Sequence, residues 1–373
     1  MTRTDDANLA HNVQVLFQPF MVGTLSVHNR LVVAPMTRVS ATAQGVPTAQ
    51  MADYYRRFAD GGFGLVITEG LYTDERSSQG YLFQPGLANT AQREGWRAIV
   101  AGVHASGGRI IAQLMHAGAL SQGNVHGASN IGPSARRPKG EQMAFYRGEG
   151  QYPVPEAMTA QDIAQVIASF ADAAIRAQDA GFDGIEIHGA NGYLLDQFLT
   201  QGINLREDGY SGSVMARLRL IREVVGAVRD AAGPLFVIGL RISQAKVNDF
   251  THKWFGGEQE AAEIFSALGA LPLDYLHTTE HEAWKPAFGE GLSLAALAKK
   301  HSGLPVLANG SLHDLVQATA ILHCAEADAV TLGRAALTHP DWPQRVAQGK
   351  SLKSFDPGML SPIADLANAQ NLR

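Results

Sequence analysis

The sequence GIEIHGANGYLLDQFL, residues 184–199, changes its hydrophobic period in the middle. Ile185 and Ile187 belong to a short apolar run that is typical of a buried strand. Apolar residues then recur at helical spacing between Leu195 and Leu199. We therefore predict a strand over residues 184–188, then a turn and a helix.

Three polar side chains lie at this junction. His188 is expected to end the strand, and Asn191 and Tyr193 are expected in the turn that starts the helix. Loops that follow strands carry the active sites of parallel α/β barrels. Taken singly, these residues could be a satisfied core histidine, a capping asparagine and a structural tyrosine. Taken together, we interpret them as candidate catalytic residues.

Outward from this stretch, strand-like runs recur along the chain. The eight runs are Leu31–Met36, Leu65–Gly70, Arg109–His116, Gly184–His188, Leu235–Ser243, Tyr275–Thr279, Pro305–Gly310 and Ala329–Arg334. Amphipathic helices follow most of them, and the clearest helix begins at a capping Thr159 with Asp162 three residues later. Eight such units predict a closed (β/α)8 TIM barrel. A doubly wound open sheet is the alternative, but no GxGxxG motif opens a helix after an early strand.

Two further features belong to the ends of this barrel. Residues 16–29 have a Gly23 turn between two short β-like pieces, which predicts an N-terminal β-hairpin that closes one end. Long βα loops are expected at 117–157, 248–258 and 280–291. The first is rich in Gly, Pro and Ser, and we expect it to form a lid or pocket wall.

Aromatic residues on the two other long loops leave two readings open. Trp254, Phe255, Trp284 and Phe288 could line a flat, apolar substrate channel, or they could only pack the loops against the barrel.

The length of 373 residues allows one large domain or two. With eight barrel units, we expect a single domain over residues 1–373, with residues 1–10 as a disordered tail. The net charge is −5 and the pI is about 6.2, which argues against nucleic acid or an anionic membrane as partner.

Cys324 is the only cysteine, so no disulfide can form within the chain. The N-terminus lacks a signal-peptide pattern, and no apolar run approaches the ~18 residues of a membrane span. We expect a cytoplasmic enzyme.

The predicted strand ends are polar, with few acids. They lack the paired carboxylates of a glycosidase and the carboxylate cluster of a metal enzyme, so no metal site is predicted. The last two ends read Asn309-Gly310-Ser311 and Gly333-Arg334. Glycine backbone N–H groups and an arginine suit a phosphate, and such a site after strands seven and eight recurs in barrels. We therefore predict a phosphate-bearing cofactor or substrate.

The order of these motifs resembles the Old Yellow Enzyme family of FMN-dependent ene reductases, from about residue 16 to 349. The matching segments include NRLVVAPMTR (29–38), GLVITEG (64–70), GGRIIAQLMHAGAL (107–120), GFDGIEIHGANGYLLDQFL (181–199), LRIS (240–243), LANGS (307–311) and ADAVTLGRAALTHPDWPQRV (327–346). Any one segment is only suggestive, whereas their order at successive strand ends is specific.

The resemblance implies an FMN across the C-terminal mouth of the barrel. Its ring would contact Pro35, Met36, Thr37, Gly70, Gln113 and Arg241. Asn309, Gly310, Ser311, Gly333 and Arg334 would complete the cofactor site at the phosphate. Arg241 would face the part of the ring where negative charge builds up on reduction.

The resemblance also implies a substrate site. His188 and Asn191 would donate hydrogen bonds to a carbonyl or nitro oxygen, and Tyr193 would protonate the α-carbon. Trp284 is a further predicted substrate contact. The reductant would be NADH or NADPH. The substrates would be small alkenes such as α,β-unsaturated carbonyls, maleimides or nitroalkenes, and the protein a monomer or homodimer.

The chain departs from the family pattern in three places, one of which is Ala119, where an Arg is often found. Residues 210–217 lose a glycine and the Asn of the usual YGGSxxNR, and Met115 stands where an aromatic is often found. The difference at residues 210–217 concerns loop geometry and subunit contacts, and the difference at Met115 concerns packing beside the flavin.

Two other functions are considered. A phosphate-gripping barrel lyase would need a lysine at a strand end, but Lys246, Lys253 and Lys285 are all expected in loops. A non-catalytic FMN-binding barrel would bind the cofactor without passing electrons to an alkene.

Overall fold

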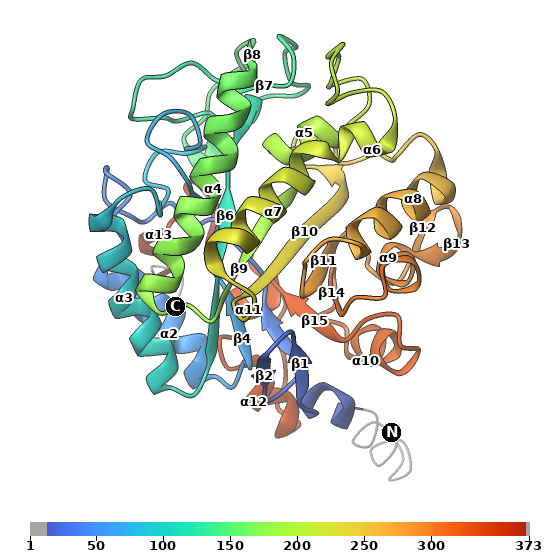
Figure 1. Ribbon diagram of the computed structural model, residues 1–373. Helices are drawn as coiled ribbons and strands as arrows, with labels where there is room; N and C mark the ends of the chain where they lie inside the picture. The colour runs from blue at the N-terminus through green and yellow to red at the C-terminus, as the bar shows by residue number, and fades with distance from the viewer. Residues whose placement is uncertain (1–12, 371–373) are drawn as a thin grey trace.

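The structure, a computed structural model, describes residues 13–370, so the predicted tail at residues 1–10 lies outside the described residues. Eight parallel strands form a closed ring (Figure 1). In order they are β3 (Leu31–Val33), β4 (Leu65–Ile67), β6 (Arg109–Met115), β9 (Gly184–Asn191), β10 (Val237–Lys246), β11 (Tyr275–Thr279), β14 (Val306–Asn309) and β15 (Ala329–Leu332). Pairing of β15 with β3 closes the ring, which confirms the predicted (β/α)8 barrel.

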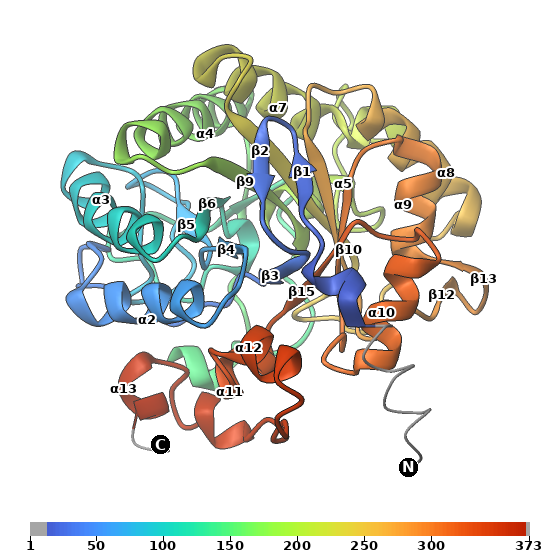
Figure 2. The same ribbon diagram turned by 90° about the horizontal axis from the view of Figure 1, so that it is seen from below.

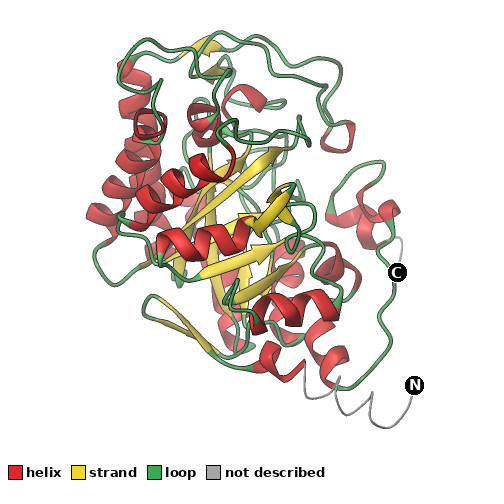
Figure 3. Ribbon diagram, turned by 90° about the vertical axis from the view of Figure 1, so that its right-hand side faces the viewer, coloured by secondary structure: helices red, strands yellow, loops and turns green. Residues whose placement is uncertain are grey.

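Helices surround the strands (Figure 3). The longer ones are α2 (Ala49–Asp60), α3 (Thr90–Ala105), α4 (Ala160–Ala180), α7 (Arg219–Ala232), α8 (Gly257–Gly269), α9 (Leu294–Ser302) and α10 (Leu315–His323). The predicted capping box of α4 is confirmed, because Thr159 and Asp162 each accept a hydrogen bond from the other's backbone N–H. Gly233 ends α7 with a φ of 79°, which favours glycine.

Short elements occupy the connections. They are η1 (Gln14–Phe17), β5 (Leu71–Tyr72), η2 (Gly118–Leu120), β7 (Ile131–Gly132), η3 (Ala144–Tyr146), β8 (Glu156–Ala157), α5 (Leu194–Leu199), α6 (Val214–Arg217), β12 (Pro286–Phe288), β13 (Glu290–Ser293), α11 (Arg334–Thr338), α12 (Trp342–Ala347), η4 (Pro357–Leu360) and α13 (Leu366–Gln370). Within residues 13–370, no helix is long and apolar enough to cross a membrane.

The predicted N-terminal hairpin is confirmed. Strands β1 (Phe20–Val22) and β2 (Leu25–Val27) pair antiparallel and lie across the lower end of the barrel (Figure 2). Phe20, Val22 and Val27 pack into the apolar cluster that fills the barrel interior. Gly23 turns with a φ of 55°, and a Cβ there would collide with the Asp274 carboxylate. The hairpin therefore seals the end opposite the predicted site.

Two strands continue beyond their predicted ends. Strand β9 runs to Asn191 and β10 runs to Lys246. The predictions that His188 ends its strand, that Asn191 lies in the turn and that Lys246 lies in a loop are therefore wrong. The reason is pairing. His188 lies opposite Arg241, and after an irregularity in the register Asn191 lies opposite Lys246, so the two strands support each other's extension.

The loop over residues 117–157 forms a wall above the strand ends. It supplies Leu120, Met143, Tyr146 and Tyr152 to a small apolar cluster that also contains Tyr193. Its β7 and β8 lie at the top of the molecule, opposite the hairpin (Figure 1). This position supports the predicted lid or pocket wall.

Candidate active site

The turn from β9 into α5 brings the three predicted catalytic residues together. The rings of His188 and Tyr193 meet edge to face, with their centroids 4.9 Å apart. Asn191 adopts a left-handed φ of 62°, which an asparagine tolerates better than most residues. Its carboxamide lines a cavity that opens at the strand ends.

His188 is a buried, neutral imidazole with one defined tautomer. Burial and the neighbouring Arg241 charge hold the pKa of His188 well below its usual 6.5. The backbone N–H of Ala190 donates to Nδ1 at 3.3 Å, so the ring proton lies on Nε2. Nε2–H is therefore the hydrogen-bond donor of this ring.

Tyr193 belongs to a group of buried phenols. Its hydroxyl oxygen lies 2.5 Å from that of Tyr81, which in turn packs on the ring of Tyr146 at 4.6 Å. Burial raises the pKa of Tyr193, although the Tyr81 hydroxyl and the Arg241 charge both lower it. Tyr193 thus keeps its proton at neutral pH. Tyr81 and Tyr146 were missed by sequence reasoning, because their loops show no period.

Arg241 lies directly beside His188 in the parallel register and beside His277 on the other side. One Nη donates to Asn309 Oδ1 at 3.1 Å, while the buried Nε has no partner among the described residues. Burial lowers the pKa of Arg241, and the Glu186 carboxylate opposes that shift. The side chain is a fixed cation with a donor still to be satisfied.

A hydrogen-bonded layer lies within the barrel next to Arg241. Glu186 accepts from Gln113 Nε2 at 2.8 Å, from the Tyr275 hydroxyl at 3.0 Å and from His277 Nδ1 at 2.9 Å. His277 Nε2 also bonds Thr331 Oγ1 at 2.9 Å. Sequence reasoning missed Glu186 and His277. The available signal was a carboxylate in the middle of an otherwise apolar strand.

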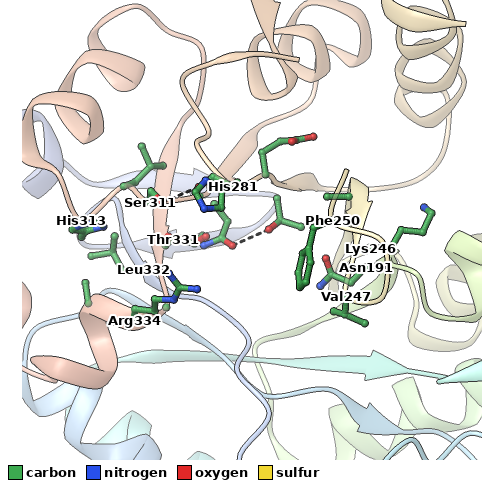
Figure 4. A pocket seen from close by; sticks show the side chains of 18 residues that line it. Asn191, Lys246, Val247, Phe250, His281, Ser311, His313, Thr331, Leu332 and Arg334 are labelled. Atoms are coloured by element: carbon green, nitrogen blue, oxygen red, sulfur yellow. Dashed lines mark hydrogen bonds between the residues drawn. The ribbon is translucent and has the colours of Figure 1, made fainter. Parts of the chain in front are cut away.

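A cavity of about 430 Å³ opens at the ends of β10, β11, β14 and β15. The predicted phosphate residues Gly310, Ser311, Gly333 and Arg334 line it. In Figure 4, Ser311 and Arg334 face Asn191 and Phe250 across the opening. Gly310 has a φ of 144°, and a Cβ there would overlap the backbone oxygen of Glu280. The close approach of the backbone therefore requires this glycine.

Asn309 plays a different part from its predicted neighbours. Its carboxamide bonds Arg241, Thr279 Oγ1 and the carbonyl of Thr331, so its side-chain groups are already engaged. In the structure Asn309 holds Arg241 in place. Its predicted contact with a cofactor therefore depends on its backbone.

The remaining predicted cofactor residues follow the ends of β3, β4 and β6. A Cβ on Gly70 would come within 2.6 Å of Met115 Sδ, so Gly70 and Met115 are in close contact. Gln113 is buried and its amide already donates to Glu186. The backbone of Pro35, Met36 and Thr37 continues from β3, and Tyr146 donates from its hydroxyl to the Thr37 carbonyl at 3.3 Å.

The four aromatic residues of the two long loops divide between the two readings. Phe255 lines a second, smaller cavity, whereas Phe288 packs against the main core. Trp254 is buried and packs on Phe265 with ring centroids 5.8 Å apart, and Trp284 packs against the main core. Neither tryptophan lines either of the two cavities, so the substrate contact of Trp284 stays a prediction. Phe250, which is 79% exposed, lines the larger cavity instead and was missed.

A second cavity of about 230 Å³ lies behind the catalytic turn. Arg136 and Arg137 from the long loop line one part of it, and Gln197 and Thr200 from α5 line another. Lys246 is in the walls of both cavities.

The residues present fit an FMN. The larger cavity falls within the ~300–1,000 Å³ of small-ligand sites. Glycine backbone and Arg334 suit a phosphate at one end. The unpartnered Nε of Arg241 offers a charged donor to an electron-rich ring edge.

Comparison with known proteins gives a consistent result. The profile of the NADH:flavin oxidoreductase / NADH oxidase family matches residues 15–353. A probable flavin mononucleotide-dependent alkene reductase of Leishmania infantum is 36% identical, with 93% of this chain and 94% of that protein covered. Among solved structures, the Old Yellow Enzyme homologue of Zymomonas mobilis is 32% identical with a TM-score of 0.83, covering 91% of this chain and 94% of that one. Morphinone reductase in complex with tetrahydroNAD is 33% identical with a TM-score of 0.82, covering 92% and 93%.

Proposed function

Because the chain belongs to the NADH:flavin oxidoreductase / NADH oxidase family, which includes the Old Yellow Enzymes, we propose how its own residues carry out the family's reaction. The chain is an FMN-dependent oxidoreductase that reduces activated C=C bonds at the expense of NADH or NADPH. The arrangement of His188, Asn191 and Tyr193 beside Arg241 is the observation that carries the assignment of roles.

His188 and Asn191 bind the activating oxygen of the alkene substrate. The neutral His188 ring donates from Nε2, because Nδ1 is occupied by the Ala190 N–H. Asn191 adds a carboxamide N–H from the cavity wall. Both donors withdraw electron density from a conjugated C=C, so its β-carbon becomes a better hydride acceptor.

Tyr193 supplies the proton to the α-carbon. Its hydroxyl is protonated at neutral pH because burial raises its pKa, and Tyr81 holds it in one orientation. The Arg241 charge stabilises the phenolate left after transfer, since it lowers the pKa of Tyr193.

Bound FMN supplies the hydride equivalent that NADH or NADPH provides. Arg241 places a fixed positive charge for the electron-rich edge of the ring, and Asn309 holds that charge in position. Gly310, Ser311, Gly333 and Arg334 hold the phosphate. The roles of Pro35, Met36, Thr37, Gly70 and Gln113 along the ring are part of the same proposal.

Tyr81, Tyr146 and Tyr152 form an apolar cluster with Tyr193, so the proposed acid lies among aromatic rings. We infer α,β-unsaturated ketones and aldehydes, maleimides and nitroalkenes as the substrate class. Lys246 ends a strand, as a Schiff-base lyase would require, but both carboxylate oxygens of Asp196 bind its amine at 2.8 Å. The lyase alternative is therefore not favoured.

The experiment is an anaerobic visible spectrum of the purified protein before and after NADPH, and then after cyclohexenone. We expect a flavin spectrum that bleaches with NADPH and returns with the enone. A protein that bleaches but does not recover its colour would contradict the alkene substrate class.

The partners and location remain part of this proposal. We infer a small-molecule alkene as the only class of partner, without nucleic acid or membrane, in a cytoplasmic monomer or homodimer. The single thiol, Cys324, is exposed and unpaired, as suits a reducing compartment. Light scattering during gel filtration would give the oligomeric state.

A further inference from the structure

A fully buried ion pair lies directly behind the catalytic turn. Both carboxylate oxygens of Asp196, on α5, accept from Lys246 Nζ at 2.8 Å. Asp196 is 0% exposed and Lys246 is 2% exposed. Lys246 also donates to the carbonyl of Gln244 at 3.3 Å. Burying two charges in this way gives little or no net stability compared with apolar residues, so stability alone does not explain the pair.

The carboxylate of Asp196 holds the backbone of the turn. Asp196 Oδ2 accepts from the N–H of Gly192 at 2.6 Å, and Oδ1 accepts from Thr200 Oγ1 at 3.2 Å. Gly192 stands between Asn191 and Tyr193, the two residues proposed to bind and protonate the substrate. The carboxylate therefore fixes the peptide that separates these two side chains.

Lys246 connects the same turn to β10. It lies opposite Asn191 in the parallel register, and the next residue, Val247, donates its N–H to the Asn191 carbonyl at 3.0 Å. The Asn191 N–H donates to Ser243 Oγ at 2.8 Å. These bonds hold a non-glycine residue at a φ of 62°, a conformation that persists only where its surroundings support it.

The position of the pair also relates it to the cavities. Lys246 lines both the larger and the smaller cavity, and Figure 4 shows it beside Asn191 on the wall of the larger one. The pair thus lies between the two cavities, at the back of the groups that face the substrate.

We propose that Lys246 and Asp196 are a positioning pair for the alkene half of the reaction. The carboxylate sets the backbone of the Asn191–Tyr193 turn, and the lysine fixes that carboxylate against β10. Neither side chain touches the reacting atoms. The inference rests on the proposed roles of His188, Asn191 and Tyr193.

The test measures the binding of 4-hydroxybenzaldehyde to the FMN-loaded protein by visible absorption. The oxygen of this phenol is a probe for the proposed His188 and Asn191 donors, which would bind it as they bind the substrate oxygen. In Lys246→Met/Asp196→Leu both charges and the acceptor for Gly192 are lost. We expect its Kd to rise about 10-fold or more, the loss typical of a buried hydrogen bond, while FMN content and Tm stay near those of the parent.

A second double variant separates the acceptor from the charge. Lys246→Met/Asp196→Asn keeps an amide oxygen for the Gly192 N–H and removes both charges. We expect its Kd to return to within about threefold of the parent value, since the hydrogen bond to the turn is retained. If the leucine variant does not fold, Asp196→Asn alone is measured in its place. It leaves the buried Lys246 charge without its carboxylate, so the phenol Kd should rise, and an unchanged Kd would overturn the positioning role.

The matched control is Lys299→Met, which breaks the Lys299–Asp328 pair at the opposite end of the barrel. It is expected to lower Tm and leave the phenol Kd unchanged. An unchanged Kd in Lys246→Met/Asp196→Leu would overturn the positioning role. His188→Ala distinguishes this result from failure of the proposed site, because an unchanged Kd in that variant would instead contradict the phenol-binding assignment itself.

Discussion

The two ends of the barrel use their polar residues in opposite ways. At the hairpin end, Asp183, Asp274 and Asp328 each stand immediately before a strand. Each carboxylate accepts the backbone N–H of a residue at the start of the neighbouring strand, at 2.7–2.8 Å: Ile110, Ile238 and Val306 respectively. The same type of hydrogen bond thus joins β6 to β9, β10 to β11 and β14 to β15.

Each of these acids also pairs with a basic side chain from the helix that leads into the neighbouring strand: α3 before β6, α7 before β10 and α9 before β14. Asp183 meets His104 at 2.8 Å, Asp274 meets Arg229 at 2.8 Å, and Asp328 meets Lys299 at 2.5 Å. Each of these three acids thus has both a backbone donor and a basic side chain as partners.

At the opposite end of the barrel, hydrogen-bond donors are available to a ligand. Arg241 Nε is buried without a partner, and Nε2 of His188 is the proton-bearing nitrogen of a ring whose Nδ1 is already occupied. Buried polar groups normally find a partner, so an arginine and a histidine donor available beside the strand ends indicate a ligand site there. Residues that stabilise the barrel and residues that carry its chemistry therefore lie at different ends of the same strands. The variants that follow test this division.

The largest effect is expected for Tyr193→Phe. Loss of the general acid should slow reoxidation by cyclohexenone by about 10²–10⁴-fold, because no other proton donor is as well placed. Stopped-flow absorbance would measure this step, and the rate of reduction by NADPH should stay within a few-fold of the parent. A parent-like rate of reoxidation would remove Tyr193 from the acid role.

Glu69 lies at the catalytic end, yet its carboxyl is expected to affect stability. Glu69→Gln tests this exception to the division between the two ends. Burial raises the pKa of the Glu69 carboxyl from 4.5 to about 7, although the Arg38 N–H and the Tyr55 hydroxyl oppose this. The folded protein therefore binds this proton more tightly than the unfolded chain does. The resulting stabilisation is complete below about pH 4.5 and is lost as the pH rises through about 7, a loss of about 3 kcal/mol.

Thermal unfolding at pH 5 and pH 8 would measure this dependence. The parent should lose stability across this range, and Glu69→Gln should lose less. Equal pH dependence in the two proteins would show that Glu69 does not titrate in this window.

Asp274→Ala tests the hairpin end. It removes the acceptor for the Ile238 N–H and leaves Arg229 without its carboxylate, so unfolding should become easier by about 2 kcal/mol. A lower Tm with an unchanged kcat for cyclohexenone is the expected result. A large fall in kcat at a temperature where the variant is folded would break the division between the two ends.

The smallest effect is expected for Cys324→Ser. The thiol is exposed at the end of α10 and belongs to neither end's polar network, so stability should change by less than about 0.5 kcal/mol. Activity and Tm should both match the parent. A measurable loss of turnover would give Cys324 a role that its position does not indicate.

Much of the fold followed from local signals. The eight apolar runs, the Thr159–Asp162 capping box and the Gly23 turn each act through neighbouring residues, so sequence alone identified the barrel and its hairpin. The sequence also placed His188 in the fourth of the eight predicted strands, although β9 continues three residues beyond it. The prediction was wrong for Asn191 and Lys246, because the extension of β9 and β10 depends on pairing between strands about 50 residues apart.

The partners of the site residues could not be predicted from the sequence. Tyr81 contacts Tyr193 across 112 residues, and Lys246 meets Asp196 across 50. Glu186 accepts hydrogen bonds from three side chains on two other strands, β6 and β11. No period or motif records such contacts, because each depends on which side chains the closed ring brings together.

The sequence by itself determined the barrel, the end that carries the chemistry and the identity of the candidate donors, because hydrophobic period and turn residues act over a few positions. Only the tertiary structure decided which of these groups are free to act. Closure of the ring buries His188 beside Arg241, engages Asn309 within the protein and leaves Arg241 Nε without a partner. Burial and charge proximity, which set protonation and hydrogen bonding, arise only when distant strands meet.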